Sequence, residues 1–334
     1  MMQCGADIRY QNDELLKEEI TFAQLMDEWL EEKKEMVKES TYIQYYRLMN
    51  VHIKPELGAY MLSELSRQQL NDFLKEKYRS GRRDGKGGLS AKTVSDIRAV
   101  IIQNMEYAKS QEYPYTDVSH LFCPRQHQPD IEILSLEEQQ KLEKILFKNI
   151  NPLKIGVLLA LYGGLRIGEV CAIQWKDFSL DSGTIKISKT ISRIQDISTD
   201  SVNRTKVIVE TPKTEKSNRI IPLPSFILKI LKPYIRQDEC YIITGTVKYM
   251  EPRIFLNKYK KILEEAGMNS FTFHALRHTF ATRCVENDFD PKSLSEILGH
   301  SDVSITLQRY VHPTLELKRE QMEKLGRVSV NKVI

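Results

Sequence analysis

One contrast in the spacing of apolar residues constrains the fold of this 334-residue chain more than any other feature. Most of the chain repeats apolar residues with the three- to four-residue period of amphipathic helices. Residues 184–222 instead alternate apolar and polar residues, and the runs GTIKISKTISRI, NRTKVIVE and NRIIPLP predict three antiparallel strands. The pattern predicts a mainly α (α+β) protein that contains one small antiparallel sheet.

The first part of the chain predicts a small helical domain. Its four predicted helices cover residues 21–38, 40–54, 66–78 and 91–111. Thr21 and Gln24 form a capping-box signature ahead of the first helix, and the second helix is expected to end before Pro55. The glycine-rich segment GRRDGKGG, residues 81–88, separates the third helix from the fourth. Four helices of this length can bury one face each in a shared core.

The rest of the chain predicts a larger, mostly helical domain behind a linker. Residues 114–134 contain three prolines and no sustained period, which is typical of a linker. Helical patterns resume at the capping box that begins with Ser135. The predicted organisation is an N-terminal tail over 1–20, a helical domain over 21–113, a linker over 114–134, a second domain over 135–312 and a C-terminal tail helix over 313–334.

Charge and cysteine content narrow the class of protein. The net charge is −6 over residues 1–39, +3 over 40–130 and +7 over 131–334. Residues 40–334 therefore carry a net positive charge that could bind a polyanion. The sequence has no apolar run of the ~18–20 residues that a membrane span needs, and its acidic N-terminus lacks the apolar segment of a signal peptide. The five scattered cysteines have neither CxxC nor Cys/His ligand spacing, which argues against a disulfide scaffold or structural zinc. We expect a cytoplasmic protein without a membrane partner.

Six polar residues in the second domain form a set that can perform chemistry. They are Arg166 in LYGGLRIGEV, Lys213 in TPKTEKSNRIIPLP, His274 and Arg277 in TFHALRHTFATRC, His300 in LGHS and Tyr310 in QRYVH. Singly, each has an ordinary structural explanation, such as a surface charge or a packed ring. Together they supply phosphate-binding cations, a general base, a general acid and an oxygen nucleophile. Neither a metal-ligand pattern nor a Walker-type glycine loop accompanies them, so we expect no cofactor.

These motifs resemble those of the tyrosine recombinases, the phage integrase family. GGLRIGEV looks like the first arginine box, HALRH the His-x-x-Arg box, LGHS the second-histidine box and QRYVH the nucleophile box, while TPKT followed by SNRIIPLP looks like the lysine hairpin. The resemblance spans about residues 135–312. Residues 21–112 resemble the family's SAM-like core-binding domain in pattern rather than in motif.

The resemblance implies a DNA strand transferase that works without metal or ATP. Tyr310 would attack the scissile phosphate and leave a 3′-phosphotyrosyl link and a free 5′-hydroxyl. Arg166 and Arg277 would hold the non-bridging oxygens, and His300 would donate a further hydrogen bond. The 5′-hydroxyl of a partner strand would then attack the phosphotyrosine.

The resemblance also implies the groups that move protons. His274 would be the general base for the phenol, and Lys213 the general acid for the leaving 5′-oxygen. Glu169 stands at a position that is usually acidic in the family, and we expect it to orient a neighbouring side chain. Trp175 is expected in the core.

Double-stranded DNA is the expected partner. Basic candidates for DNA contacts in the first domain are Arg79, Arg82, Arg83, Lys92 and Arg98. The resemblance implies a monomer when free, a homotetramer on synapsed DNA, nucleoid association when bound, and accessory DNA-bending or excision factors. Residues 313–334 are expected either to pack on their own domain or to dock on the next protomer.

Several functions stay open at this point. Within the family they are a mobile-element or phage integrase, a resolvase of chromosome dimers and a DNA inversion recombinase. The long hairpin insertion at 191–210 favours an integrase, and the short segment ahead of the first helix predicts no separate arm-site DNA-binding domain. Outside the family, a type IB topoisomerase would relax DNA without exchanging strands, a DNA-binding regulator would lack catalysis, and a metal-dependent nuclease would be inhibited by EDTA.

Overall fold

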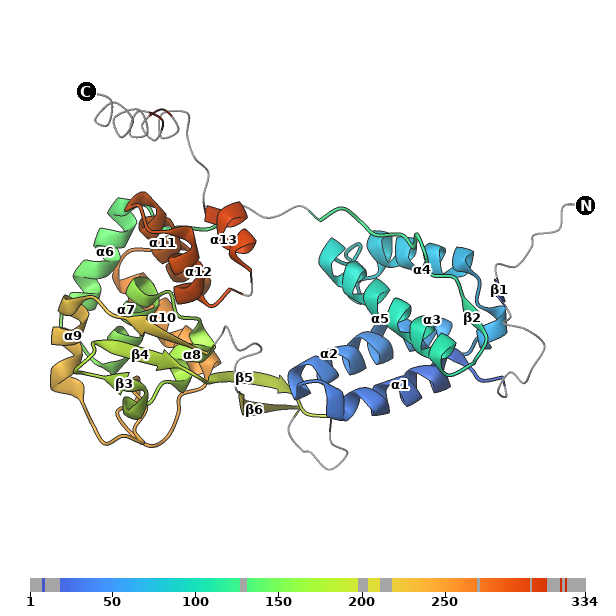
Figure 1. Cartoon of the computed structure of the whole chain (residues 1–334), viewed down its shortest axis with the longest axis horizontal. Helices are drawn as coiled ribbons and strands as arrows, with labels where there is room; N and C mark the ends of the chain where they lie inside the picture. The colour runs from blue at the N-terminus through green and yellow to red at the C-terminus, as the bar shows by residue number, and fades with distance from the viewer. Residues whose placement is uncertain are drawn as a thin grey trace, which may run out of the picture. The chain divides into compact units, whose positions relative to one another are not determined.

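The computed structural model describes residues 8–9, 19–126, 131–197, 204–210, 218–268, 271–300, 302–310, 319 and 322. The chain divides into two compact units (Figure 1). The first comprises Met1–Pro129 and Ile197–Ser201, and the second comprises Asp130–Asp196 and Val202–Ile334. Each unit has its own hydrophobic core. In the part of the chain that the structure describes, no helix is both long and apolar enough to cross a membrane.

The first unit is a set of helices around one core. Its elements are β1 (Ile8–Arg9), α1 (Phe22–Met36), α2 (Glu39–Leu48), the π-helical turn η1 (Met49–Ile53), α3 (Lys54–Leu57), the 3-10 turn η2 (Leu62–Glu64), α4 (Arg67–Ser80), α5 (Ala91–Ser110) and β2 (Tyr115–Thr116). The predicted capping box at Thr21 and Gln24 is present, and Ser66 and Gln69 form a second one ahead of α4. The apolar face of α1 is buried in the core, as its spacing predicts.

The second helix, α2, ends at Leu48 and therefore before Pro55, as the sequence predicted, but helical structure continues past this proline. Helix α2 runs into η1, and α3 begins at Lys54 with Pro55 in its first turn. The N–H groups of a first turn have no partner within the helix, so a proline there costs no hydrogen bond. The π-helical turn therefore resets the helix at the position where proline is tolerated.

Part of the predicted linker belongs to the first unit. Tyr115–Thr116 pairs with Ile8–Arg9 as β2 and β1. Leu121 is buried in the first core, and the N–H of Phe122 donates to Asn71 Oδ1 at 2.6 Å. The first core therefore extends to residue 122, beyond the predicted boundary at residue 113.

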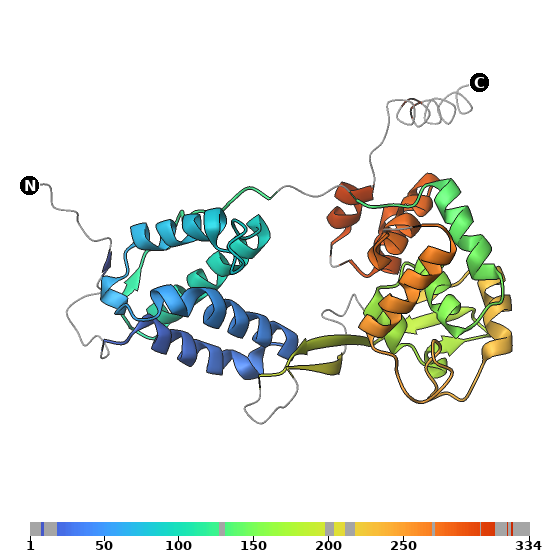
Figure 2. The ribbon, with the colours of Figure 1, turned by 180° about the vertical axis from the view of Figure 1, so that it is seen from behind.

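The second unit surrounds the apolar helix α7. Its elements are α6 (Leu136–Phe147), α7 (Pro152–Gly163), α8 (Ile167–Ala172), η3 (Trp175–Asp177), β3 (Phe178–Ser179), β4 (Thr184–Ile187), β5 (Thr190–Gln195), β6 (Thr205–Glu210), β7 (Arg219–Pro222), α9 (Ser225–Leu231), η5 (Lys232–Tyr234), α10 (Pro252–Glu265), α11 (Phe273–Glu286), α12 (Pro291–Leu298) and α13 (Val303–Tyr310). Helix α7 is buried on nearly every side and packs against α6, α8, α10 and α11 (Figure 2). Trp175 is buried in this core, as expected.

The strand region forms two small sheets rather than the one predicted. The run GTIKISKTISRI breaks at residues 188–189 into β4 and β5. Strand β4 lies between β3 and β7, whereas β5 pairs antiparallel with β6 over Thr190↔Glu210 to Gln195↔Thr205. Strand β4 buries Ile185 and Ile187 in the core, while β5 buries only Ile191. Alternation of apolar and polar residues predicts a strand but does not specify the strand with which it pairs. The pairing depends on which face of the strand is buried in the folded unit.

Candidate active site

The glycine turn after α7 positions the first arginine. Gly164 has φ +66° and ends α7 in the left-handed conformation that favours glycine. A Cβ at this position would lie 2.6 Å from the Phe280 ring. Arg166 follows as the N-cap of α8, and its side chain is 38% exposed. The guanidinium is therefore fixed at the start of a helix and still reaches the surface.

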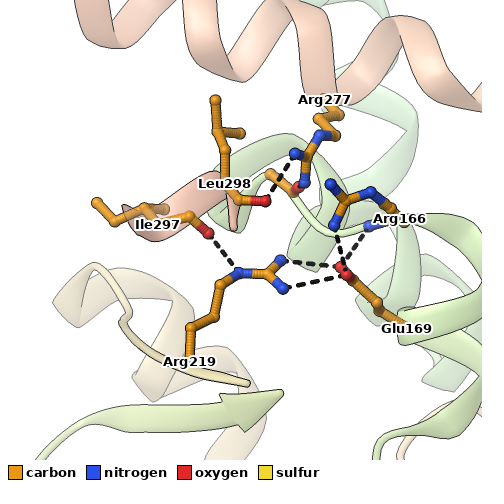
Figure 3. A network of polar contacts seen from close by, with 7 residues as sticks. Arg166, Glu169, Arg219, Arg277, Ile297 and Leu298 are labelled. Atoms are coloured by element: carbon orange, nitrogen blue, oxygen red, sulfur yellow. Dashed lines mark hydrogen bonds and ion pairs between the residues drawn. The ribbon is translucent and has the colours of Figure 1, made fainter. Parts of the chain in front are cut away.

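Arg277 holds two helix ends together from the buried face of α11. Its Nη1 donates to the Gly164 carbonyl at 2.7 Å, and its Nη2 donates to the Leu298 carbonyl at 2.7 Å (Figure 3). Burial and the charge of Arg166 lower its pKa to about 9. Arg277 therefore joins the C-terminal ends of α7 and α12 at the site.

Glu169 binds two arginines, which fulfils the expectation that it orients a neighbour. Its carboxylate accepts from the Arg166 N–H at 2.9 Å and from Arg166 Nη1 at 2.8 Å. Arg219 donates to both oxygens, at 3.0 and 2.9 Å (Figure 3). Burial alone would raise the pKa of Glu169, but the hydrogen bonds and charge of Arg219, with the charge of Arg166, lower it to about 2. The carboxylate is ionised at neutral pH.

Arg219 is a site residue that the sequence argument did not single out. Its Nε donates to the Ile297 carbonyl at 2.6 Å, so it connects β7 to α12 as well as to Glu169 (Figure 3). The signal was present in NRIIPLP: Arg219 and Ile221 occupy the buried positions of the alternating strand. A charged residue at a buried strand position requires a partner.

The nucleophile candidate contacts a histidine other than the one predicted. Tyr310 Oη lies 2.5 Å from His278 Nδ1, and both residues are buried. His274, the predicted base, packs edge-on against His278, with 4.3 Å between the ring centroids. The sequence signal for His278 was its place in HALRH, four residues after His274 and therefore on the same helix face.

The three histidines of the site are neutral at pH 7. Loss of hydration and neighbouring arginines lower the pKa of His274 and of His278 to about 4 and that of His300 to about 3. His300 follows the left-handed Gly299 that ends α12, and its Nδ1 lies 2.8 Å from Thr306 Oγ1. Burial raises the pKa of Tyr310, although nearby arginines oppose the shift.

The structure thus brings together Arg166, His274, Arg277, His300 and Tyr310 from α8, α11, α12 and α13 within one unit. Lys213 lies outside the described residues. Two guanidinium groups beside neutral imidazoles and a phenol can bind a phosphodiester and attack it. Within the described ranges, no group of three or more His, Cys, Asp or Glu side chains is placed to hold a metal ion.

The basic residues predicted to contact DNA differ in their surroundings. Arg79 and Arg83 are exposed, as is the ion pair of Lys92 with Asp96. Arg82 binds Asp84 through two hydrogen bonds of 3.1 and 2.7 Å. Arg98 is half-buried, and its Nε donates to the Leu121 carbonyl at 3.1 Å. Arg98 therefore has a structural role within the first unit, and Arg83 Nη2 makes a longer contact of 3.5 Å with the Val51 carbonyl.

Comparison with known proteins identifies the class. Residues 134–316 match the phage integrase family, and residues 21–78 match the N-terminal SAM-like domain of phage integrases. The chain belongs to the phage integrase family. It is a tyrosine recombinase, an enzyme that transfers DNA strands.

Individual relatives agree with this assignment. A XerC-like tyrosine recombinase of Caldanaerobacter subterraneus subsp. tengcongensis is 29% identical over 92% of this chain and 83% of its own length. The transposase of transposon Tn916 from Enterococcus faecalis is 25% identical, and the match covers 58% of this chain and 51% of the transposase.

Solved structures share the mainly helical fold that the sequence predicted. The Tn1549 transposon integrase in complex with transposon right end DNA has a TM-score of 0.69 at 23% identity, covering 92% of this chain and 100% of that one. A lambda integrase dimer bound to a COC′ core site has a TM-score of 0.61 at 17% identity, covering 87% and 95%.

Proposed function

We propose that this recombinase cuts and rejoins double-stranded DNA through a 3′-phosphotyrosyl intermediate on Tyr310. The observation that carries the proposal is the placement of the Tyr310 phenol on a neutral imidazole, in the same unit as Arg166 and Arg277. Burial raises the pKa of Tyr310, and the charges of the nearby arginines act in the opposite direction. A phenolate formed here is stabilised by the same cations that bind the phosphate.

The other side chains take the roles that their chemistry allows. Arg166 and Arg277 bind the non-bridging oxygens of the scissile phosphate, and neutral His300 donates a hydrogen bond to it. Lys213 protonates the leaving 5′-oxygen. The phenolic proton passes to an imidazole of the site. The resulting phosphotyrosine keeps the energy of the phosphodiester, so a 5′-hydroxyl from another strand can reverse the step.

In the cell, we propose integration and excision of a mobile element. Similarity to the Tn916 transposase and to the Tn1549 integrase supports this role, as does the β5–β6 hairpin. The second candidate is resolution of chromosome dimers, because the relative that matches 92% of the chain is named for neither a phage nor a transposon. A homotetramer on synapsed DNA, assisted by accessory DNA-bending or excision factors, would perform either reaction.

A strand-exchange assay tests this function. Two labelled duplexes carrying the DNA that flanks this gene are incubated with the protein in EDTA, alongside Tyr310→Phe. We expect recombinant junctions from the wild-type protein and none from the variant. Relaxation of a supercoiled plasmid without new junctions would indicate a topoisomerase instead, and loss of activity in EDTA would indicate metal-dependent cleavage.

A further inference from the structure

We propose that His278, rather than His274, is the general base that takes the phenolic proton of Tyr310. The inference rests on the proposed phosphotyrosyl mechanism and assigns one of its proton transfers. Its basis is the contact between the two side chains, 2.5 Å from His278 Nδ1 to Tyr310 Oη. That distance is short for a hydrogen bond, and a base in direct hydrogen-bond contact with a hydroxyl can accept its proton.

The protonation states give this contact a direction. His278 is neutral at pH 7, since burial, His274, Arg309 and Arg277 lower its pKa. The raised pKa of Tyr310 keeps its hydroxyl protonated. A neutral imidazole has one acceptor nitrogen, so the proposal requires the tautomer of His278 with its proton on Nε2, in which the Tyr310 O–H donates to Nδ1. In that tautomer the contact is already the hydrogen bond along which the proton leaves.

His274 is less suited to this role. It lies one turn before His278 on α11, and its ring meets the His278 ring edge-on at 4.3 Å. Its side chain is more exposed than that of His278, which is buried beside the phenol. Its position fits a hydrogen bond to the phosphate that arrives from solution. In this assignment His274 contacts the phosphate, and His278 accepts the proton of the nucleophile.

The step balances as follows. The Tyr310 O–H bond breaks, its proton moves to His278 Nδ1, and the phenolic oxygen forms a bond to phosphorus. The bond from phosphorus to the 5′-oxygen breaks, and that oxygen receives a proton from Lys213. In the reverse step, His278 returns its proton to the leaving phenolate. Transfer concerted with P–O bond formation suits a weak base, because the phenol becomes more acidic as its oxygen bonds to phosphorus.

The tautomer of His278 provides a test that needs no DNA. The full chain is labelled with ¹⁵N-histidine, and long-range ¹H–¹⁵N correlations are recorded at pH 7. The signal of His278 is identified by its loss in His278→Asn. We expect an unprotonated Nδ1 and a protonated Nε2. A proton on Nδ1, in either the neutral or the cationic ring, would overturn the proposal, because His278 would then donate to the phenol.

Single-turnover kinetics test the base itself. Formation of the covalent adduct is timed at saturating protein on nicked duplexes made from the DNA that flanks the gene. We expect His278→Asn to slow the step ~10²-fold or more while DNA affinity is retained, which also reports that the variant folds. A fluorinated tyrosine at position 310, whose phenol is more acidic, should recover part of that loss. The matched variant His274→Asn should gain nothing from the same replacement.

Other results contradict the assignment. If His278→Asn forms the adduct at the wild-type rate, His278 is not the base. If it forms the adduct faster, His278 restrains the tyrosine. If only His274→Asn is rescued by the fluorinated tyrosine, the base is His274. An adduct formed by Tyr310→Phe would instead remove the proposed function, so the two failures are distinguishable.

Discussion

At the scale of single residues, the site depends on one buried carboxylate. Glu169 and Arg219 are each only 5% exposed at the side chain, and Arg166 shares the same carboxylate. Removing one member of a buried ion pair leaves the other charge without compensation, which costs more than the pair contributes. Glu169 therefore links the orientation of Arg166 to the stability of the second unit.

Replacing this carboxylate by an amide tests that link. We expect Glu169→Gln to lower the free energy of unfolding by about 3–5 kcal/mol, because the charge of Arg219 stays buried. The control is Glu286→Gln, which breaks the more exposed Arg283–Glu286 pair and should cost about 0–1 kcal/mol. Urea denaturation followed by circular dichroism measures both. Equal losses of unfolding free energy in the two variants would show that Glu169 contributes no more to stability than a member of the more exposed pair.

The histidines predict how stability varies with pH. The pKa values of His274 and His278 are about 4 and that of His300 about 3, below the ordinary histidine value of 6.5. Between pH 6.5 and these lower values the unfolded chain binds more protons than the folded one, so the free energy of unfolding should fall as pH drops below about 6.5. The stability contributed by ionised Glu169 is present above the ordinary glutamate pKa of 4.5 and is lost as pH falls toward about 2.

Urea midpoints measured from pH 7 to pH 5 separate the two contributions. Changing His274, His278 and His300 to asparagine together should flatten the dependence in this range. A slope that persists in the triple variant would mean that other groups cause it.

At the scale of elements, local chemistry made the helices predictable. The capping boxes at Thr21 and Ser135 lie where the sequence indicated, and Thr272 and Asp290 cap α11 and α12 in the same local way. Their residue types act within a few positions along the chain, so a sequence reveals them directly. The pairing of β4 with β7 and the burial of Arg219 depend on residues far apart in the chain, so no local pattern indicates which partners meet.

The turn that joins α7 to Arg166 can be tested with a pair of glycines. Gly164 and Gly267 have φ values of +66° and +67° and both follow helices, but only Gly164 is packed, against Phe280 and Leu298. Alanine at either position should pay about 1–2 kcal/mol for the left-handed conformation. Gly164→Ala should lower the free energy of unfolding by about 1–3 kcal/mol more, because the added methyl group overpacks the site. It should also slow adduct formation, because Arg277 binds the Gly164 carbonyl. Equal unfolding free energies for the two variants would contradict this packing role.

At the scale of the whole molecule, DNA binding should respond to salt and to selected surface charges. When binding releases counterions, the logarithm of the binding constant falls linearly with the logarithm of the salt concentration. We expect Arg79→Ala and Arg83→Ala each to weaken binding and to reduce that slope by about 1. Arg82→Ala is the matched control, because its guanidinium is already paired with Asp84. Fluorescence anisotropy on one duplex over a salt series measures all three, and an effect confined to Arg82→Ala would contradict the assignment.

The motif set predicted the family from sequence because its residues are diagnostic even when dispersed over the chain. The contacts within the set were not predictable in the same way. Which histidine of HALRH meets Tyr310 depends on how α13 packs against α11, and that packing is a property of the folded unit.

The most direct measurement is the chemical identification of the covalent link. The protein is incubated with end-labelled nicked duplexes in EDTA and denatured in SDS, and the labelled adduct is hydrolysed to its phosphoamino acid. We predict phosphotyrosine from the wild-type protein, linked to a 3′ DNA end, and no adduct from Tyr310→Phe. A phosphoserine or phosphohistidine link, or an adduct that persists in Tyr310→Phe, would contradict the mechanism.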